Sequence, residues 1–302
     1  MPATKPVRLI EPFGVGGGLD LLARALAQWL SRLWDQPVTV ENIAGAGATA
    51  GPAHVAKSPA DGYTLLVNTS AQAYTAALVK NLPYDPLKDF IPIAPLTSQP
   101  YVLVAGKAAG VTTVGELASA AKAKPGALKF GSTGMGTGTH FVVERFNLAA
   151  GIRAVHVPAG PADAIADIIA KTVAGRTAYM MAPISLALSQ IRDGRLVALG
   201  VSGARRSSLL PEVPTIAEAG VAGFDYPIWY GVWAPAGTPA AVVNRLAKDI
   251  ARVLPEMRDW LREHGADSMS MTQAEFARFV LAESESAAQI IKAAGIDFQN
   301  NP

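Results

Sequence analysis

Short apolar segments alternate with amphipathic ones along the first two thirds of the chain, and this alternation constrains the fold more than any other feature. Short apolar, β-branched runs predict strands, whereas apolar residues that recur every three or four positions predict helices. A chain that alternates the two forms an α/β fold with mostly parallel sheets flanked by helices. About eight strands are expected, at residues 7–10, 37–42, 63–68, 101–106, 128–133, 153–158, 177–183 and 196–202.

The helical segments complete this pattern. The first helix is expected from Asp20, as its N-cap, to about Trp34, and the tail is expected to be helical at residues 240–265 and 273–295. At 302 residues the chain is long enough for two domains, and the strand count suits two α/β lobes better than one barrel.

Composition excludes several classes of protein. The 26 basic and 24 acidic residues nearly balance, and no run of Lys or Arg provides a face for nucleic acid. The absence of cysteine removes disulfides, thiol catalysis and thiolate metal sites. The four histidines do not have metal-ligand spacing, and no apolar stretch is long enough to span a membrane. We therefore expect no metal, no cofactor and no nucleic-acid partner.

Four loops that run from a strand to a helix are the candidate ligand sites, because open α/β sheets bind ligands beyond the carboxyl ends of their strands. Residues 11–20 read EPFGVGGGLD, and residues 131–140 read GSTGMGTGTH. Glycine permits close approach of the backbone, and a helix N-terminus offers free N–H groups to an anion. A plain tight turn remains the alternative for both loops. Ser70 and Ser185 either contact ligand or cap the helices that follow them.

Enzyme motifs fit the chain poorly. Leu19 stands where a dinucleotide fingerprint needs its third glycine, and Thr137 and Gly138 replace the Lys and Ser/Thr of a phosphate-binding P-loop. Ser132 and His140 could join an acid in a triad, but their spacing does not require it. None of the loops contains Arg or Lys, so neutral donors would hold an anion, which suits a carrier better than a catalyst.

Taken together, several blocks give the chain a strong resemblance to a known family. They include EPFGVGGGLDLLAR, PADGYTLLVNTS, GSTGMGTGTH, IRDGRLVALGVSGARRSSLLPEVPTIAEAG and WYGVWAPAGTP, in this order. The chain resembles the Bug family, the periplasmic solute receptors of tripartite tricarboxylate transporters, from about Arg8 to Gly295. The resemblance implies a two-lobed type II periplasmic-binding fold with a two-crossing hinge. Lobe one would comprise residues 1–103 and 226–302, and lobe two residues 104–225.

The resemblance also implies a ligand site. A small di-, tri- or aromatic carboxylate would bind between the lobes and be delivered through transient contact with membrane subunits of the transporter. The protein would be a periplasmic monomer whose signal peptide is absent here, and not an enzyme. The implied ligand-binding residues are Pro12, Phe13, Gly17, Gly18, Ser70, Ala71, Ser132, Thr137, Thr139, His140, Ala159, Ala182 and Pro183.

One departure from the family bears on the ligand. The family usually has an aromatic residue and then Lys-Gly after the Val-Pro pair that ends at Pro158, whereas this chain has Ala159, Gly160 and Pro161. We expect this change to widen the cleft and to remove a positive charge. Two other functions stay open: a ligand sensor for a signalling partner, and a hydrolase or lyase that uses Ser132 and His140.

Overall fold

The computed structural model describes residues 5–45, 48–134, 137–159, 164–295 and 299–300, and the chain divides into two compact units. Unit 1 comprises residues 1–98, 229–263 and 267–302, and unit 2 comprises residues 99–228 and 264–266. The main boundaries fall after residues 98 and 228. The chain also passes between the units on either side of residues 264–266.

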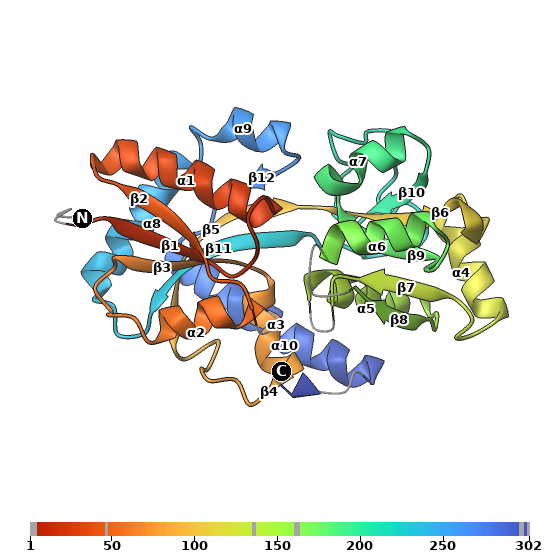
Figure 1. The fold of residues 1–302 in the computed structure, drawn as a ribbon, viewed down its shortest axis with the longest axis horizontal. Helices are drawn as coiled ribbons and strands as arrows, with labels where there is room; N and C mark the ends of the chain where they lie inside the picture. Colours follow the sequence, from red (N-terminus) through yellow and green to blue (C-terminus); the bar gives the residue numbers. More distant parts are fainter. Residues whose placement is uncertain (1–4, 46–47, 135–136, 160–163, 296–298, 301–302) are drawn as a thin grey trace. The chain divides into compact units, whose positions relative to one another are not determined.

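Unit 1 is built on a six-stranded sheet with the order β12-β5-β11-β3-β1-β2 (Figure 1). Its strands are β1 (Val7–Glu11), β2 (Val38–Asn42), β3 (Thr64–Thr69), β5 (Phe90–Gln99), β11 (Ile228–Pro235) and β12 (Asp267–Ser268). Its helices are α1 (Gly18–Trp34), α2 (Ala50–Ala56), α3 (Ala71–Leu78), α8 (Ala240–Val253), α9 (Arg258–Glu263) and α10 (Gln273–Ala294). A separate pair joins β4 (Val79–Lys80) to β13 (Gln299–Asn300).

Unit 2 is built on a five-stranded sheet with the order β10-β6-β9-β7-β8. Its strands are β6 (Tyr101–Gly106), β7 (Lys129–Ser132), β8 (Val155–Pro158), β9 (Tyr179–Pro183) and β10 (Leu196–Val201). Its helices are α4 (Val114–Ala123), α5 (Gly138–Ala150), α6 (Ala164–Val173) and α7 (Ile184–Arg192), with a 3-10 turn at Lys107–Ala109. The predicted two-lobed α/β fold and all eight predicted strands are confirmed.

Both sheets are mixed, whereas the sequence predicts mostly parallel ones. Strand β1 pairs in parallel with β2 and β3, and β7 pairs in parallel with β8 and β9. The pairs β11–β3, β12–β5, β10–β6 and β6–β9 are antiparallel. The sequence pattern does not predict β5 and β11. Two prolines interrupt β5, and proline inside a run argues against a strand.

Side chains from both ends of the sequence build the core of unit 1. The strand β11 is buried along its whole length and lies between β3 and β5. The indole Nε1 of Trp34, at the end of α1, donates a hydrogen bond of 2.8 Å to Asp249 Oδ2 in α8. Residues 229–263 are therefore an integral part of the unit that contains the N-terminal strands.

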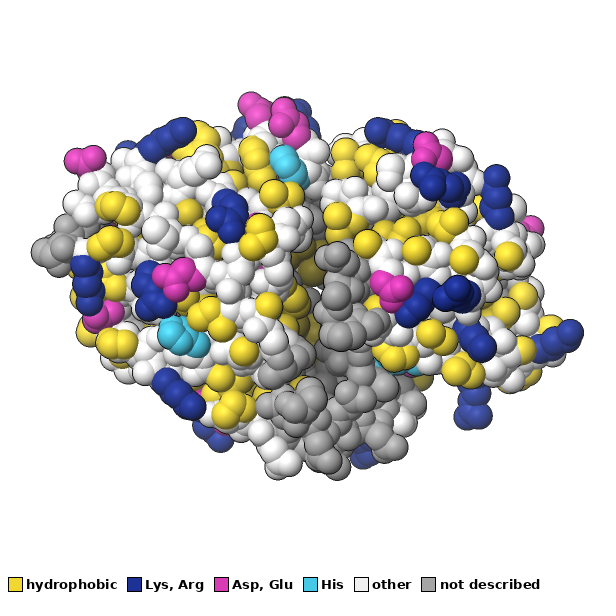
Figure 2. All heavy atoms as spheres, viewed as in Figure 1, with side chains coloured by type: hydrophobic (Ala, Val, Ile, Leu, Met, Phe, Trp, Pro, Cys, Tyr) yellow, Lys and Arg dark blue, Asp and Glu magenta, His cyan; other side chains and the backbone are white. Residues whose placement is uncertain are grey.

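The parallel strands place the candidate loops. Strands β1 and β3 are neighbours and run in the same direction, so the loops that follow them leave the same edge of the unit 1 sheet. The loops after β7 and β9 share an edge of the unit 2 sheet for the same reason. Charged side chains are dispersed over the face shown in Figure 2, in keeping with the nearly balanced charge.

Candidate functional site

The loop between β1 and α1 leaves a helix N-terminus open. Gly17 is the N-cap of α1 and no side chain caps this helix. The prediction that Asp20 is the N-cap is wrong, because Asp20 lies inside the first turn. Its Oδ2 accepts a 2.9 Å hydrogen bond from the Gly16 backbone N–H, and its carboxylate forms an ion pair with Arg24. The first N–H groups of α1 therefore have no acceptor within the helix.

The glycines of this loop are not all needed for its conformation. Gly16 has a φ of 88°, which favours glycine. A Cβ at Gly17 or Gly18 would come no closer than 3.6 Å to another atom, which is ordinary contact, and a Cβ at Gly14 would meet nothing within 4 Å. A tight turn therefore explains Gly16 alone. The conformation of the loop does not require glycine at the other three positions.

Glu11 lies directly before this loop and is fully buried. Its Oε2 accepts hydrogen bonds from the Phe13 backbone N–H at 3.0 Å and from Asn42 Nδ2 at 2.7 Å, whereas its Oε1 has no partner among the described residues. Burial raises the pKa of Glu11 to about 7, and the two hydrogen bonds act against this rise. The sequence places Glu11 at the start of the loop, and no motif singles it out as a site residue.

Asn42 joins Glu11 to the first turn of α1. Its Nδ2 also donates to Asp20 Oδ1 at 2.9 Å, and its Oδ1 accepts from the Arg24 guanidinium at 2.9 Å. Arg24 is thus committed to Asp20 and Asn42. The loop contains no Lys or Arg, so the hydrogen-bond donors it can offer an anion are its backbone N–H groups.

Ser70 and Ala71 stand at the end of β3, on the same edge of the sheet. Ser70 is buried, and its backbone N–H donates to the Trp229 carbonyl at 2.8 Å. Ser70 occupies the N-cap position of α3 but makes no capping hydrogen bond, so the capping alternative is wrong. The Ala71 N–H donates to Thr69 Oγ1. Tyr230, which the sequence analysis did not select, pairs with Thr69 in the sheet.

In the second glycine loop, which lies in unit 2, the threonine hydroxyl groups hydrogen-bond to one another. Thr133, Thr137 and Thr139 place their Oγ1 atoms 2.7–3.1 Å from one another. Thr137 caps α5 by accepting the N–H of His140. Gly134 has a φ of 139°, and a Cβ at Gly131 or Gly138 would clash with Ile168 or Tyr101. Local structure therefore accounts for each of these three glycines. Residues 135–136 lie outside the described part of the chain.

Buried Ser132 and His140 form a cluster with the half-buried His156 next to this loop. Ser132 Oγ lies 2.6 Å from Nε2 of His156, a residue that the sequence analysis did not select. The rings of His140 and His156 stack with centroids 4.0 Å apart. Burial, aided by His156, lowers the pKa of His140 to about 3, and burial lowers the pKa of His156 to about 4. Both rings are therefore neutral near pH 7. The histidine that contacts Ser132 is His156, whereas the hydrolase alternative assigned that contact to His140.

The remaining predicted residues lie at the ends of strands in unit 2. Ala182 is buried in β9 and Pro183 is half-buried at the end of that strand. Pro183 pairs with Tyr101 of β6. The Ala159 N–H donates to the Ser132 carbonyl at 2.8 Å. Gly160 and Pro161, which complete the departure from the family pattern, lie outside the described residues.

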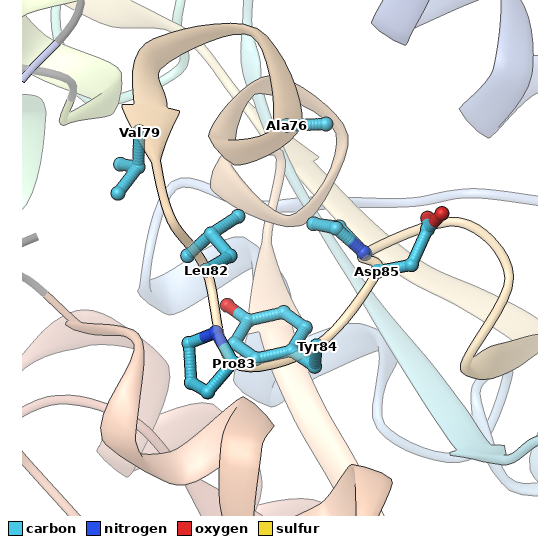
Figure 3. A pocket seen from close by; sticks show the side chains of 7 residues that line it. Ala76, Val79, Leu82, Pro83, Tyr84 and Asp85 are labelled. Carbon is cyan, nitrogen blue, oxygen red and sulfur yellow. The ribbon is translucent and has the colours of Figure 1, made fainter. Parts of the chain in front are cut away.

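A surface depression of about 560 Å³ lies elsewhere in unit 1 (Figure 3). It is lined by Ala76, Val79, Leu82, Pro83, Tyr84, Asp85 and Pro86, which include none of the predicted ligand residues. The carboxylate of Asp85 already accepts the N–H groups of Leu87 and Lys88. Its one charged side chain is the carboxylate of Asp85, which would repel a carboxylate ligand.

Among the described residues, no group of three His, Asp or Glu side chains could hold a metal ion. In the same part of the chain, no helix is both long and apolar enough to cross a membrane.

Comparison with known proteins decides the family. Residues 22–296 match the family described as "Tripartite tricarboxylate transporter family receptor". The chain belongs to this receptor family. The receptor is 33% identical to protein BugT of Bordetella pertussis over 296 residues, which is 96% of this chain and 90% of BugT. It is 34% identical over 286 residues to a UPF0065 protein of Pseudomonas sp. strain P51, covering 93% of this chain and 84% of that protein.

Solved structures of similar proteins agree with this assignment. The receptor superposes on R. palustris Rpa4515 with adipate with a TM-score of 0.87 at 32% identity, covering 98% of this chain and 99% of that chain. Rhodopseudomonas palustris MatC with bound malate gives a TM-score of 0.83 at 29% identity, covering 96% and 99%. The periplasmic binding protein BugD gives 0.83 at 28% identity, covering 97% and 99%. The receptor is thus a solute-binding protein and not an enzyme.

Proposed function

We propose that this receptor captures an ionised organic carboxylate between its two lobes and delivers it to the membrane subunits of a tripartite tricarboxylate transporter. The observation that carries the proposal is the uncapped N-terminus of α1 behind glycines that its own fold does not need. Helix N-termini bind anions through free N–H groups and the helix dipole. Relatives with bound adipate and malate support a dicarboxylate as the ligand class.

The proposed site draws on both lobes. We propose lobe one at residues 1–103 and 226–302, lobe two at residues 104–225, and a monomer that works in the periplasm. The proposed ligand-binding residues are Pro12, Phe13, Gly17, Gly18, Ser70, Ala71, Ser132, Thr137, Thr139, His140, Ala159, Ala182 and Pro183. The small side chain of Ala159 would admit a longer or bulkier acid than an aromatic residue at this position would.

A thermal-shift screen of mono-, di- and tricarboxylates, aromatic acids included, tests the proposal. A carboxylate present at one hundred times its dissociation constant should stabilise the protein by about 2.7 kcal/mol. Isothermal titration calorimetry then measures the dissociation constant of each acid that gives a shift. A screen in which a sugar or a metal ion stabilises the protein and no carboxylate does would contradict the proposal.

Gly17→Val tests the first loop itself. Gly17 has an extended backbone with φ of −71°, and a Cβ there has room, so the variant should keep the fold. Its side chain would stand where the ligand approaches the helix end, so we expect binding to be lost. Gly115→Val is the matched control, because Gly115 is exposed in α4 and an added Cβ is also accommodated. A Gly17→Val protein that binds like wild type would show that the loop is only a turn.

A further inference from the structure

The hydroxyl group of Tyr230 lies at the N-terminus of α1. Tyr230 is 3% exposed, and its Oη is 3.6 Å from the position that a Cβ would take at Gly18. None of the hydrogen bonds made by the described residues uses this hydroxyl. Glu11 Oε1 is fully enclosed and has no partner among the described residues, whereas Tyr230 Oη is not fully enclosed.

The groups around this hydroxyl are donors without acceptors. Gly18 and Leu19 open the 17-residue helix, and their N–H groups have no acceptor in the helix or from a cap. The one nearby carboxylate in the first turn, that of Asp20, is occupied by Gly16 and Arg24. Burial raises the pKa of Tyr230, so its phenol keeps its proton at physiological pH and remains a neutral donor.

The corresponding position in unit 2 provides a contrast. Tyr101 Oη lies 2.7 Å from the place of a Cβ at Gly138, the first residue of α5, so each unit sets a tyrosine hydroxyl against the start of the helix that follows its glycine loop. Thr137 caps α5, however, and Tyr101 makes other interactions. Of the two tyrosines, Tyr230 alone faces an uncapped helix with its hydroxyl unused.

We propose that Tyr230 is a ligand-binding residue whose Oη donates a hydrogen bond to the carboxylate seated at the N-terminus of α1. The inference rests on the proposed function and assigns to it a residue that lies far along the chain from the loop. An ionised carboxylate accepts hydrogen bonds and donates none, so it suits a site made of two free N–H groups and one phenol. Gly18 is then bare because a side chain there would stand between the hydroxyl and the anion.

Tyr230→Phe tests the inference by calorimetric titration with malate, adipate, citrate and benzoate. Hydrogen bonds to charged groups contribute enough that the dissociation constant of the tightest of these acids should rise about 10- to 100-fold. The unliganded variant should unfold at the same urea concentration as wild type or a higher one, because the removed hydroxyl has no partner in the unliganded protein. Tyr84→Phe is the matched control, since Tyr84 is also buried in unit 1 but lines the depression in Figure 3.

The outcomes separate the inference from the function on which it rests. If wild type binds one of these acids and Tyr230→Phe binds it within about twofold, the inference is overturned and the proposed function stands. If the unliganded variant loses stability as affinity falls, the hydroxyl supports the fold and the inference is also overturned. Wild-type protein that binds no carboxylate overturns both.

Discussion

The carboxyl group of Glu11 is buried beneath a loop that otherwise consists of backbone and small residues. Asp20, Arg24 and Asn42 are the charged and polar side chains around it. Its protonated form leaves Oε2 free to accept from Phe13 and Asn42, with the proton on the unpartnered Oε1. Ionisation instead places a second negative charge next to that of Asp20.

Glu11 should make the unliganded protein less stable as pH rises. Its pKa is about 7 in the folded chain and about 4.5 when exposed, so between these values the folded state holds more protons and stability falls with increasing pH. From pH 5 to pH 8 the loss should be about 2–3 kcal/mol. Urea unfolding of wild type and Glu11→Gln across this range measures it. Parallel profiles for the two proteins would show that Glu11 does not titrate there.

His140 should act in the opposite direction in unit 2. Its pKa is about 3 when folded and 6.5 when exposed, so the unfolded chain binds more protons and stability falls as pH drops below 6.5. Between pH 7 and pH 5 this loss is about 2 kcal/mol. Unfolding curves at both pH values should show a smaller acid loss for His140→Gln than for wild type. An equal loss in both proteins would contradict the pKa of the buried ring.

The residues that sequence reasoning found and missed differ in a physical way. The glycines, Ser70 and Ser132 lie in or next to the connections from a strand to the following helix, which a local pattern locates. His156 reaches Ser132 only through the register of β7 and β8, in which Phe130 pairs with His156. Tyr230 reaches Gly18 only through the order of strands in the sheet. Neither pairing follows from the spacing of residues along the chain.

At the scale of elements, the strands and helices with regular patterns were predicted and the irregular ones were not. The two prolines of β5 interrupt the sequence pattern from which a strand would be predicted. The strand β11 follows a segment rich in Pro and Gly, and its run of eight buried residues does not alternate. Helix caps were harder to predict, because neither Asp20 nor Ser70 makes a capping hydrogen bond. Thr113, three residues before Glu116, does cap α4 by accepting the N–H of Glu116.

The cap of α10 should contribute measurably to stability. Thr272 Oγ1 accepts the Glu275 N–H at 3.3 Å, while Glu275 Oε2 accepts the Thr272 N–H at 2.7 Å, which completes a capping box on a 22-residue helix. Thr272→Ala should lower the free energy of unfolding by about 1 kcal/mol. Thr272→Ser retains the hydroxyl and should stay close to wild type in urea unfolding. Equal destabilisation by both changes would mean that the threonine methyl, rather than the cap, matters.

For the whole molecule, the opposite titrations of Glu11 and His140 lie in different units. Ionisation of Glu11 lowers the stability of the protein from within unit 1 as pH rises. The low pKa of His140 lowers it from within unit 2 as pH falls. We expect the double variant Glu11→Gln/His140→Gln to have a flatter stability profile from pH 5 to pH 8 than either single variant. Differential scanning calorimetry across this range would test the expectation, and a double variant as steep as either parent would contradict it.

The position of β11 sets the order in which a newly synthesised chain can acquire its structure. Because β11 lies between β3 and β5, residues 1–98 have a gap in the middle of their sheet until residue 235 has been made. Residues 99–228 are continuous in sequence, and unit 2 needs only residues 264–266 from farther along the chain. In chains arrested on the ribosome with residue 228 already outside it, hydrogen exchange should therefore find the amides of β6 and β9 better protected than those of β1 and β3, and equal protection would contradict this order. A ribosome that pauses before residue 228 would thus carry an N-terminal segment whose two open strand edges remain available to a chaperone.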